Sequence, residues 1–213
     1  MDFLPAPAVL AAFAAAGVLL AATPGPDMAL FLSRTLGGGR SHGFAALAGA
    51  MTGIFVHTCA AALGLSALLA ASARAYDAVK LAGAVYLLYL AYGALARGAS
   101  LRLDAQGAAG GGLLRSYLTG LLINLTNPKI ILFFVTFLPQ FIEADDPHAG
   151  QKFFFLGLAF IAIGVAVNSA IVLAASRFIA AAKANPRAIR WFDYGFAGLM
   201  GAFAARLALS QGR

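Results

Sequence analysis

Long apolar runs separated by short polar links dominate the sequence. Six runs are visible, each predominantly apolar over about 20 residues or more, the length that an α-helix needs to cross a bilayer. Strands of a membrane barrel would instead alternate between apolar and polar positions over about ten residues. The pattern therefore predicts an all-α integral membrane protein with six transmembrane helices. The runs cover Phe3–Ser33, Gly43–Ala71, Ala75–Ala96, Ser116–Ile142, Phe153–Ala175 and Trp191–Leu209.

The composition is typical of a chain that lies mostly in lipid. Of its 213 residues, 62% are hydrophobic and 11% are charged, whereas a soluble domain carries about 25% charged residues. Such a chain has too few polar side chains to cover a water-facing surface, and the six runs leave only short links. We therefore expect a single transmembrane domain over residues 1–213, surrounded by the lipid bilayer.

The basic residues indicate how the chain is oriented. The net charge is +7, but the basic residues are spread over short links without a nucleic-acid motif, so we expect no nucleic-acid partner. Lys and Arg concentrate in the cytoplasmic loops of membrane proteins. One side of the membrane has five of them, and the other side, formed by the first, third and fifth links, has nine: Arg34, Arg40, Arg97, Arg102, Arg115, Arg177, Lys183, Arg187 and Arg190. This bias predicts that both termini lie outside the cytoplasm.

Two of the predicted spans are interrupted at matching positions. Thr23-Pro24 begins a break in the first span, and Asn127-Pro128 begins a break in the fourth span, 104 residues later. Each half of the chain, about 1–100 and 113–213, holds three spans, so the two halves should point in opposite directions across the membrane. Inverted repeats with broken helices recur in secondary transporters, with the substrate at the repeat interface. We therefore expect a 3+3 inverted repeat with helices 1 and 4 broken.

The segment Pro24-Gly25-Pro26 should open the first span. Proline lacks an amide hydrogen and clashes with the preceding turn, so two prolines around a glycine should interrupt the helix rather than bend it. A new half-helix can begin at Pro26, and its amide end could hold a carboxylate. Asp27 follows at once, and a charge near the bilayer centre costs about 2.5–3.5 kcal/mol and so marks function. Asp27 would bind a substrate ammonium or a proton, unless it only complements the dipole of its own half-helix or reaches water.

The segment Asn127-Pro128-Lys129 should restart a helix within the fourth span. Asn is a favoured N-cap and Pro a favoured first helical residue. Lys129 then lies in the first turn, where a cation opposes the helix dipole, and it has apolar neighbours. These two costs predict a compensating partner, either Asp27 or a substrate carboxylate, unless the lysine stem reaches an interface. Asn124 lies three residues before Asn127 and is expected to share its helix face.

The remaining candidates indicate packing rather than chemistry. His57 titrates in a range that suits proton relay, but a lone histidine in an apolar span is more often a packing residue. Cys59 is the only cysteine, so neither an intrachain disulfide nor a multi-cysteine metal site can form. Gly49 and Gly53 form a GxxxG pair that permits close helix packing or a homo-oligomer, and Gly157 repeats Gly53 at the same offset. Because metal clusters, catalytic triads and Walker motifs are lacking, we expect no enzyme activity, no metal and no cofactor.

Two motifs lie about a hundred residues apart in the chain. The first is Ala22-Thr23-Pro24-Gly25-Pro26-Asp27, and the second is Asn124-Leu125-Thr126-Asn127-Pro128-Lys129, which continues through Phe133-Phe134 to Leu138-Pro139-Gln140-Phe141. Together they resemble the lysine/homoserine–threonine exporter (LysE/RhtB) family of bacterial amino-acid effluxers. The resemblance implies efflux driven by the proton motive force in the bacterial inner membrane. It also implies that both motifs line the substrate path.

These features lead us to expect a proton-coupled secondary transporter that exports amino acids or related small zwitterions. Asp27 would bind the substrate ammonium or exchange a proton, whereas Lys129 and exposed amides near Pro26 and Pro128 would hold the carboxylate. A cation or metal effluxer on the same scaffold is the alternative, because carboxylates and carbonyls at broken helices can bind ions. The few Cys and His residues count against soft metals.

Overall fold

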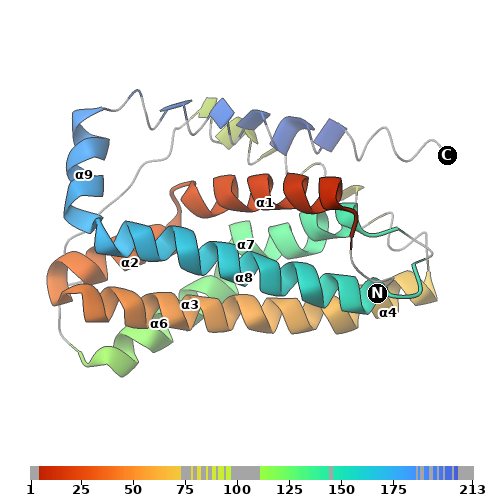
Figure 1. The fold of residues 1–213 in the computed structure, drawn as a ribbon, viewed down its shortest axis with the longest axis horizontal. Helices are drawn as coiled ribbons and strands as arrows, with labels where there is room; N and C mark the ends of the chain where they lie inside the picture. The colour runs from red at the N-terminus through yellow and green to blue at the C-terminus, as the bar shows by residue number, and fades with distance from the viewer. Residues whose placement is uncertain are drawn as a thin grey trace.

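The computed structural model describes residues 5–72, 111–143 and 146–185, with single helical positions between 78 and 96 and between 187 and 205. The regular elements in the three continuous stretches are all helical (Figure 1). They are α1 (Pro7–Ala22), α2 (Pro26–Gly38), α3 (Arg40–Ala60), a π-helical turn (Ala61–Leu65), α4 (Ser66–Ala71), α6 (Leu113–Thr126), α7 (Pro128–Leu132), a second π-helical turn (Phe133–Phe137), a 3-10 helix (Leu138–Phe141), α8 (Ala149–Leu173) and α9 (Ala175–Ala184).

The described residues hold up to four membrane-spanning helices. Arg40–Leu68 and Ala149–Leu173 are each long and apolar enough to cross a bilayer. The pair α1 and α2 is bent by 53°, and α6 with the helical segment Pro128–Phe141 is bent by 50°, so each pair can form one broken span. These four correspond to the first, second, fourth and fifth predicted spans. The third and sixth, Ala75–Ala96 and Trp191–Leu209, are described at only about half of their positions, so the count of six and the inverted repeat stay predictions.

Both helix breaks lie at the predicted prolines. After α1, Thr23 has a ψ of 124° and Gly25 is fully extended, and α2 then begins at Pro26. After α6, Asn127 has a ψ of 110°, and α7 begins at Pro128. Since the residue before a proline is disfavoured in the α region and proline itself suits the first helical position, each X-Pro step ends one helix and starts another.

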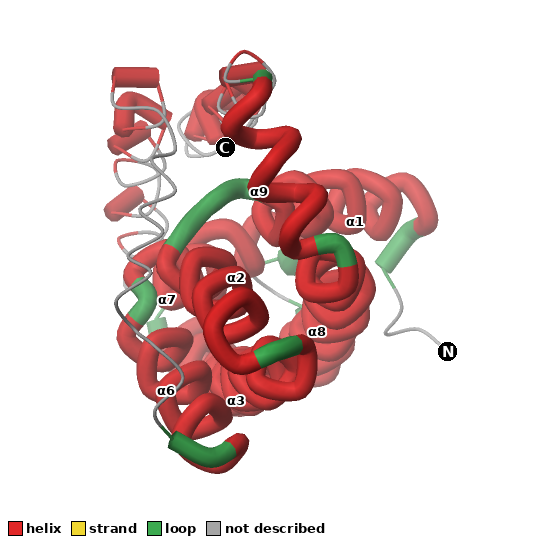
Figure 2. Tube along the Cα trace, turned by 90° about the vertical axis from the view of Figure 1, so that its left-hand side faces the viewer, coloured by secondary structure: helices red, strands yellow, loops and turns green. Residues whose placement is uncertain are grey.

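Helix α3 packs against α2, α6 and α8 (Figure 2). Its contact with α6 brings the two backbones together, because a Cβ atom on Gly49 would lie 1.9 Å from the carbonyl oxygen of Tyr117. A Cβ atom on Gly120 would likewise lie 2.0 Å from the carbonyl oxygen of Ala46. Gly49 therefore serves close packing within one chain, as small residues do between membrane helices.

A cluster of aromatic side chains fixes the segment after the second break. Phe133 and Phe160 stack with their ring centroids 4.3 Å apart, and Phe133 also stacks on Phe137 at 5.0 Å. Phe13 of α1 meets Phe141 edge to face at 5.3 Å. Such contacts join α1, α8 and the helical segment 128–141 around a buried core.

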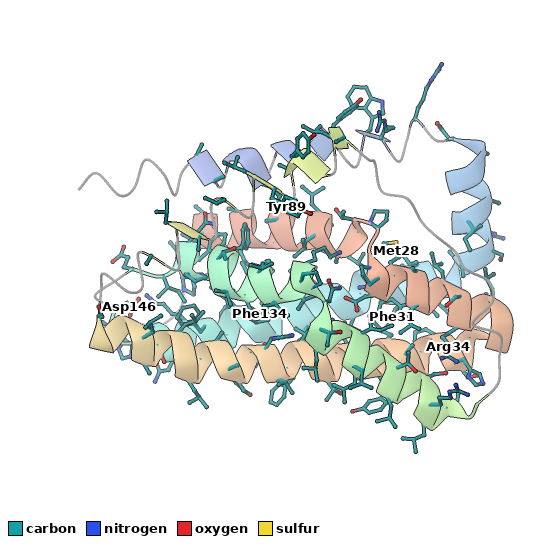
Figure 3. The ribbon with its side chains drawn as sticks, turned by 180° about the vertical axis from the view of Figure 1, so that it is seen from behind. Met28, Phe31, Arg34, Tyr89, Phe134 and Asp146 are labelled. Atoms are coloured by element: carbon teal, nitrogen blue, oxygen red, sulfur yellow. The ribbon has the colours of Figure 1, made fainter. Side chains whose placement is uncertain are left out.

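The links differ from the expected ones in length. Only Gly39 separates α2 from α3, so Arg34 and Arg40 lie inside helices rather than in a loop. Gly39 has a φ of 86°, in the left-handed region that favours glycine. Arg34 and Asp146 lie at opposite ends of the bundle (Figure 3). The basic residues Arg74, Lys80, Arg97, Arg102, Arg206 and Arg213, which entered the charge count, lie outside the described residues.

Candidate substrate site at the two helix breaks

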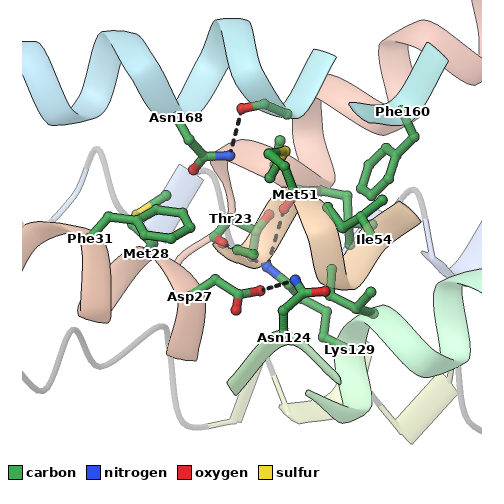
Figure 4. A pocket seen from close by; sticks show the side chains of 15 residues that line it. Thr23, Asp27, Met28, Phe31, Met51, Ile54, Asn124, Lys129, Phe160 and Asn168 are labelled. Atoms are coloured by element: carbon green, nitrogen blue, oxygen red, sulfur yellow. Dashed lines mark hydrogen bonds between the residues drawn. The ribbon is translucent and has the colours of Figure 1, made fainter. Parts of the chain in front are cut away.

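The two helix breaks face each other across a small cavity near the middle of the bundle (Figure 4). Thr23 and Asp27 reach it from the first break, and Asn124 and Lys129 reach it from the second. Residues about a hundred positions apart in the sequence therefore share one polar site. Of the predicted site residues, Asp27, Asn124 and Lys129 line this cavity, and Asn127 is hydrogen-bonded to Asp27.

Asp27 lies in the first turn of α2 and accepts two hydrogen bonds from the second break. Its Oδ2 atom lies 2.8 Å from Nδ2 of Asn127 and 3.2 Å from Nδ2 of Asn124. The other oxygen, Oδ1, is buried and makes no hydrogen bond within the described structure. A carboxylate in the first turn is stabilised by the positive end of the helix dipole. One oxygen of Asp27 is thus held in place while the other keeps its capacity to accept a proton or a donor.

Asn127 uses both ends of its side chain. Its Oδ1 accepts from the backbone amide of Lys129 at 3.0 Å, which confirms the predicted N-cap of α7. Its backbone carbonyl accepts from the amides of Ile130 and Ile131, each at 3.0 Å. The amides that follow Pro128 are therefore already bonded by Asn127, and the expectation that they stand free to hold a carboxylate is wrong in this conformation. Near Pro26 the N-cap is Gly25, which has no side chain to bond the first amides of α2. Free amides therefore stay a prediction at this break alone.

Asn124 and Asn127 reach the same atom although the helix does not continue between them. Asn124 lies in the last turn of α6, and Asn127 follows it in extended backbone. Asn124 is 1% exposed and occupies space left by Gly53, where a Cβ atom would lie 2.6 Å from Oδ1 of Asn124. The glycine pair in α3 therefore serves two purposes: Gly49 admits the α6 backbone, and Gly53 admits a site residue.

His57 has a place beside the site that the sequence did not indicate. Its Nε2 atom lies 3.5 Å from the backbone carbonyl of Asn124, at the end of α6. Its ring also stacks on Phe134 at a centroid distance of 5.7 Å, as expected for a packing residue. His57 thus joins the polar site to the aromatic core.

Lys129 binds the end of the first half-helix. Its Nζ atom donates to the carbonyl oxygens of Thr23 at 3.1 Å and Leu20 at 3.3 Å. The last carbonyls of a helix have no partner within it and favour a cation. The expected partners were Asp27 or a substrate carboxylate, but the backbone of α1 supplies this compensation. Gly25 leaves room for the ammonium, since a Cβ atom there would lie 3.2 Å from Nζ.

The two breaks therefore hold each other open. The acidic residue that follows the first break is bonded by amides of the second, and the basic residue that follows the second break is bonded to carbonyls of the first. Polar groups that proline frees inside a membrane must be satisfied within the protein. Lys129 does this for carbonyls at the first break, and Asp27 fixes the side-chain amides of Asn124 and Asn127 at the second.

The cavity between the breaks is small. Its open volume is about 30 Å³. A single water needs roughly 10–15 Å³ on this measure, so the cavity has room for only a few waters. Any larger molecule would enter only after the surrounding helices separate, so the site is closed to it in this conformation.

The described residues offer few ligands for a metal ion. Across these residues no group of three or more His, Cys, Asp and Glu side chains lies close enough to hold one. The cation alternative therefore has no ligand cluster in this part of the chain to support it.

Two broken spans that meet at a partly buried acid and a partly buried base are typical of a helical membrane transporter of the broken-helix kind. The profile of the LysE type translocator family matches residues 18–211, and the chain belongs to this family. It is accordingly a membrane translocator and not an enzyme.

Curated relatives extend over nearly the same length. The homoserine/homoserine lactone efflux protein of Salmonella typhimurium is 29% identical over 206 residues, which cover 94% of this chain and 96% of the relative. The leucine efflux protein of Salmonella choleraesuis is 30% identical over 200 residues, covering 91% of this chain and 92% of the relative. No solved structure matches the chain.

Proposed function

We propose that this chain exports amino acids across the bacterial inner membrane in exchange for protons. The observation that carries the proposal is the convergence of Asp27 and Lys129 on one cavity between two helix breaks. An acid and a base at one site suit a zwitterion, which has an ammonium and a carboxylate a few ångströms apart. The names of the two relatives, both efflux proteins for amino acids or their derivatives, support the same class of substrate.

The free oxygen of Asp27 is the acceptor for the substrate ammonium. This Oδ1 atom is buried and has no hydrogen bond among the described residues, so a charged donor would relieve an unsatisfied group. The substrate carboxylate meets the remaining N–H of Lys129 and the first amides of α2 beside Gly25. Pro24, Pro26 and Pro128 keep the backbone open for both contacts.

The same carboxylate couples transport to protons. Asp27 can bind either the substrate ammonium or a proton at Oδ1, but not both at once. A proton that arrives from the outer side displaces the substrate there, and loss of that proton to the cytoplasm restores the site. Competition for one oxygen atom thus gives exchange without a further ionisable group.

Alternating access follows from movement of the two halves, about 1–100 and 113–213, of a single transmembrane domain. The hydrogen bonds between the breaks join these halves and must be exchanged in each cycle. The excess of basic residues on one side supports an orientation with both termini in the periplasm. Reporter fusions at Met1 and Arg213 test this orientation, and cytoplasmic activity of both fusions would reverse it.

Proteoliposomes test the proposed function directly. Vesicles loaded with labelled amino acids and given a pH gradient should show efflux with the wild-type chain. Asp27→Asn and Lys129→Ala should each reduce the initial rate at least tenfold, whereas Asp146→Asn, at the far end of the bundle, should not. Wild-type rates from both site variants, with correct insertion verified, would remove the roles assigned to them.

A further inference from the structure

The cavity has a polar side and an apolar side. Thr23, Asp27, Asn124 and Lys129 form the polar side at the helix breaks. The opposite side comes from α3 and α8, where Met51, Ile54 and Phe160 face the breaks (Figure 4). Ile54 is 3% exposed and Phe160 is 2% exposed, so both are fixed parts of the core.

The charges on the cavity wall cancel. Among the described residues that line it, the charged ones are Asp27 and Lys129. The main-chain ammonium and carboxylate of a bound amino acid match this pair. A cationic side chain would need a second carboxylate and an anionic side chain a second base, and an unpaired charge in a closed cavity is strongly disfavoured.

Met51 gives the apolar side its adaptability. It is only partly buried, and its sulfur lies 3.4 Å from the position that a Cβ atom on Gly164 would occupy. The unbranched thioether side chain can take several shapes against this glycine. Asn168 lies one turn further along α8 and donates from Nδ2 to the carbonyl of Gly164 at 2.9 Å, so its amide faces the same edge of the cavity.

We propose that the transported amino acid has an uncharged, short aliphatic side chain, with at most a hydroxyl group, and that Met51, Ile54 and Phe160 form the surface on which this side chain packs. Met51 is the specificity-determining residue, because it is the adaptable member of the three. The proposal rests on the proposed function and names the substrate class of the same cavity.

A charge placed at position 51 tests the proposal. Met51→Glu is close in shape and adds the second carboxylate that a cationic side chain lacks, and Met51→Gln has the same shape without the charge. Proteoliposomes with each form are loaded with leucine, homoserine, lysine or glutamate and assayed for efflux. The wild type should move leucine and homoserine at least tenfold faster than lysine or glutamate. Met51→Glu should raise the lysine-to-leucine rate ratio at least tenfold, and Met51→Gln should not.

The outcomes separate this proposal from the proposed function. If the wild type moves lysine or glutamate as fast as leucine, and Asp27→Asn abolishes that transport, amino-acid export stands and the selectivity proposed here is overturned. An equal gain of lysine transport in Met51→Glu and Met51→Gln would also overturn it. If the wild type moves none of the four amino acids, both proposals fail. The wild-type comparison decides the selectivity even where a variant does not fold.

Discussion

The ammonium of Lys129 lies 3.1 Å from the carbonyl oxygen of Thr23, although 106 residues separate the two in the chain. This contact, with that between Asp27 and Asn127, ties each broken helix to the other. The charged residues therefore have a structural task in the closed conformation besides the substrate contacts proposed for them. Stability and transport measurements together can separate the two tasks.

Lys129→Met should weaken both the fold and transport. The change leaves the carbonyls of Leu20 and Thr23 without a donor, and an unsatisfied buried polar group costs about 1–3 kcal/mol. We expect a clearly lower melting temperature in detergent and loss of amino-acid efflux. Lys152→Met is the control, because the bond from Lys152 to Asp146 lies outside the site and its loss should leave efflux unchanged. Equal effects of the two substitutions would contradict the role of Lys129.

Asn127→Ser and Asn127→Ala should separate helix capping from the bond to Asp27. Serine can cap α7 but is too short to replace the amide that Asp27 accepts from, and alanine can do neither. Transport should fall in both variants. Only Asn127→Ala should also lose about 0.5–2 kcal/mol of stability, measured by thermal unfolding in detergent. Full transport by Asn127→Ser would show that the bond to Asp27 is dispensable.

Gly53→Ala should impair transport by displacing Asn124. A Cβ atom at this position would lie 2.6 Å from Oδ1 of Asn124, so the amide that bonds Asp27 must shift. Gly64→Ala is the matched control in the continuation of the same helix, since a Cβ atom there meets nothing within 4 Å. Efflux in proteoliposomes should fall severalfold for Gly53→Ala and stay at the wild-type level for Gly64→Ala. If the two variants transport alike, Asn124 does not need its present position.

The link before α8 should show a pH-dependent contribution to stability. Partial burial raises the pKa of Asp146, but hydrogen bonds from the Lys152 ammonium and the His148 amide outweigh it and hold the pKa below its ordinary value. A carboxyl with a lowered pKa in the folded state stabilises the fold above its unfolded pKa, about 3.9, and loses this contribution as the pH falls further. The wild type should therefore be slightly more stable than Asp146→Asn at pH 5–7, and the difference should shrink as the pH falls below about 3.9.

The control for this comparison is Glu143→Gln, which changes an exposed carboxylate in the same link. Melting temperatures of the three forms in detergent across this pH range give the result. A difference between the wild type and Asp146→Asn that persists unchanged at pH 3 would contradict the assignment.

The sequence predicted those features that depend on local backbone chemistry. Proline acts on its own neighbours, so the ends of α1 and α6 and the starts of α2 and α7 could be placed from Pro24, Pro26 and Pro128. The cap by Asn127 is equally local. The lengths of the apolar runs likewise predicted the four spans that the described residues hold. The ends of these spans differ from the predicted ends by up to several residues.

The partners of the site residues could not be predicted in the same way. Lys129 binds carbonyl groups, which every residue has, so no side-chain pattern marks Leu20 and Thr23 as its acceptors. Asn127 satisfies the amides after Pro128, and this depends on the angle between α6 and α7. The position of His57 beside Asn124 depends on the packing of α3 on α6, which two glycines permit but do not specify.

The seam between α3 and α6 constrains how the molecule changes shape. At Gly49 and Gly120 the backbone of α3 packs directly against the backbone of α6, and no side chain lies between them that could change its rotamer. In the predicted division of the chain, α3 belongs to one half and α6 to the other. Sliding of one half over the other would therefore either separate these two helix backbones or make them collide. A rotation moves points least where they are nearest to its axis. If the two halves rock as proposed, we therefore expect the pivot to run along this seam and the largest displacements to fall on the helices farthest from it.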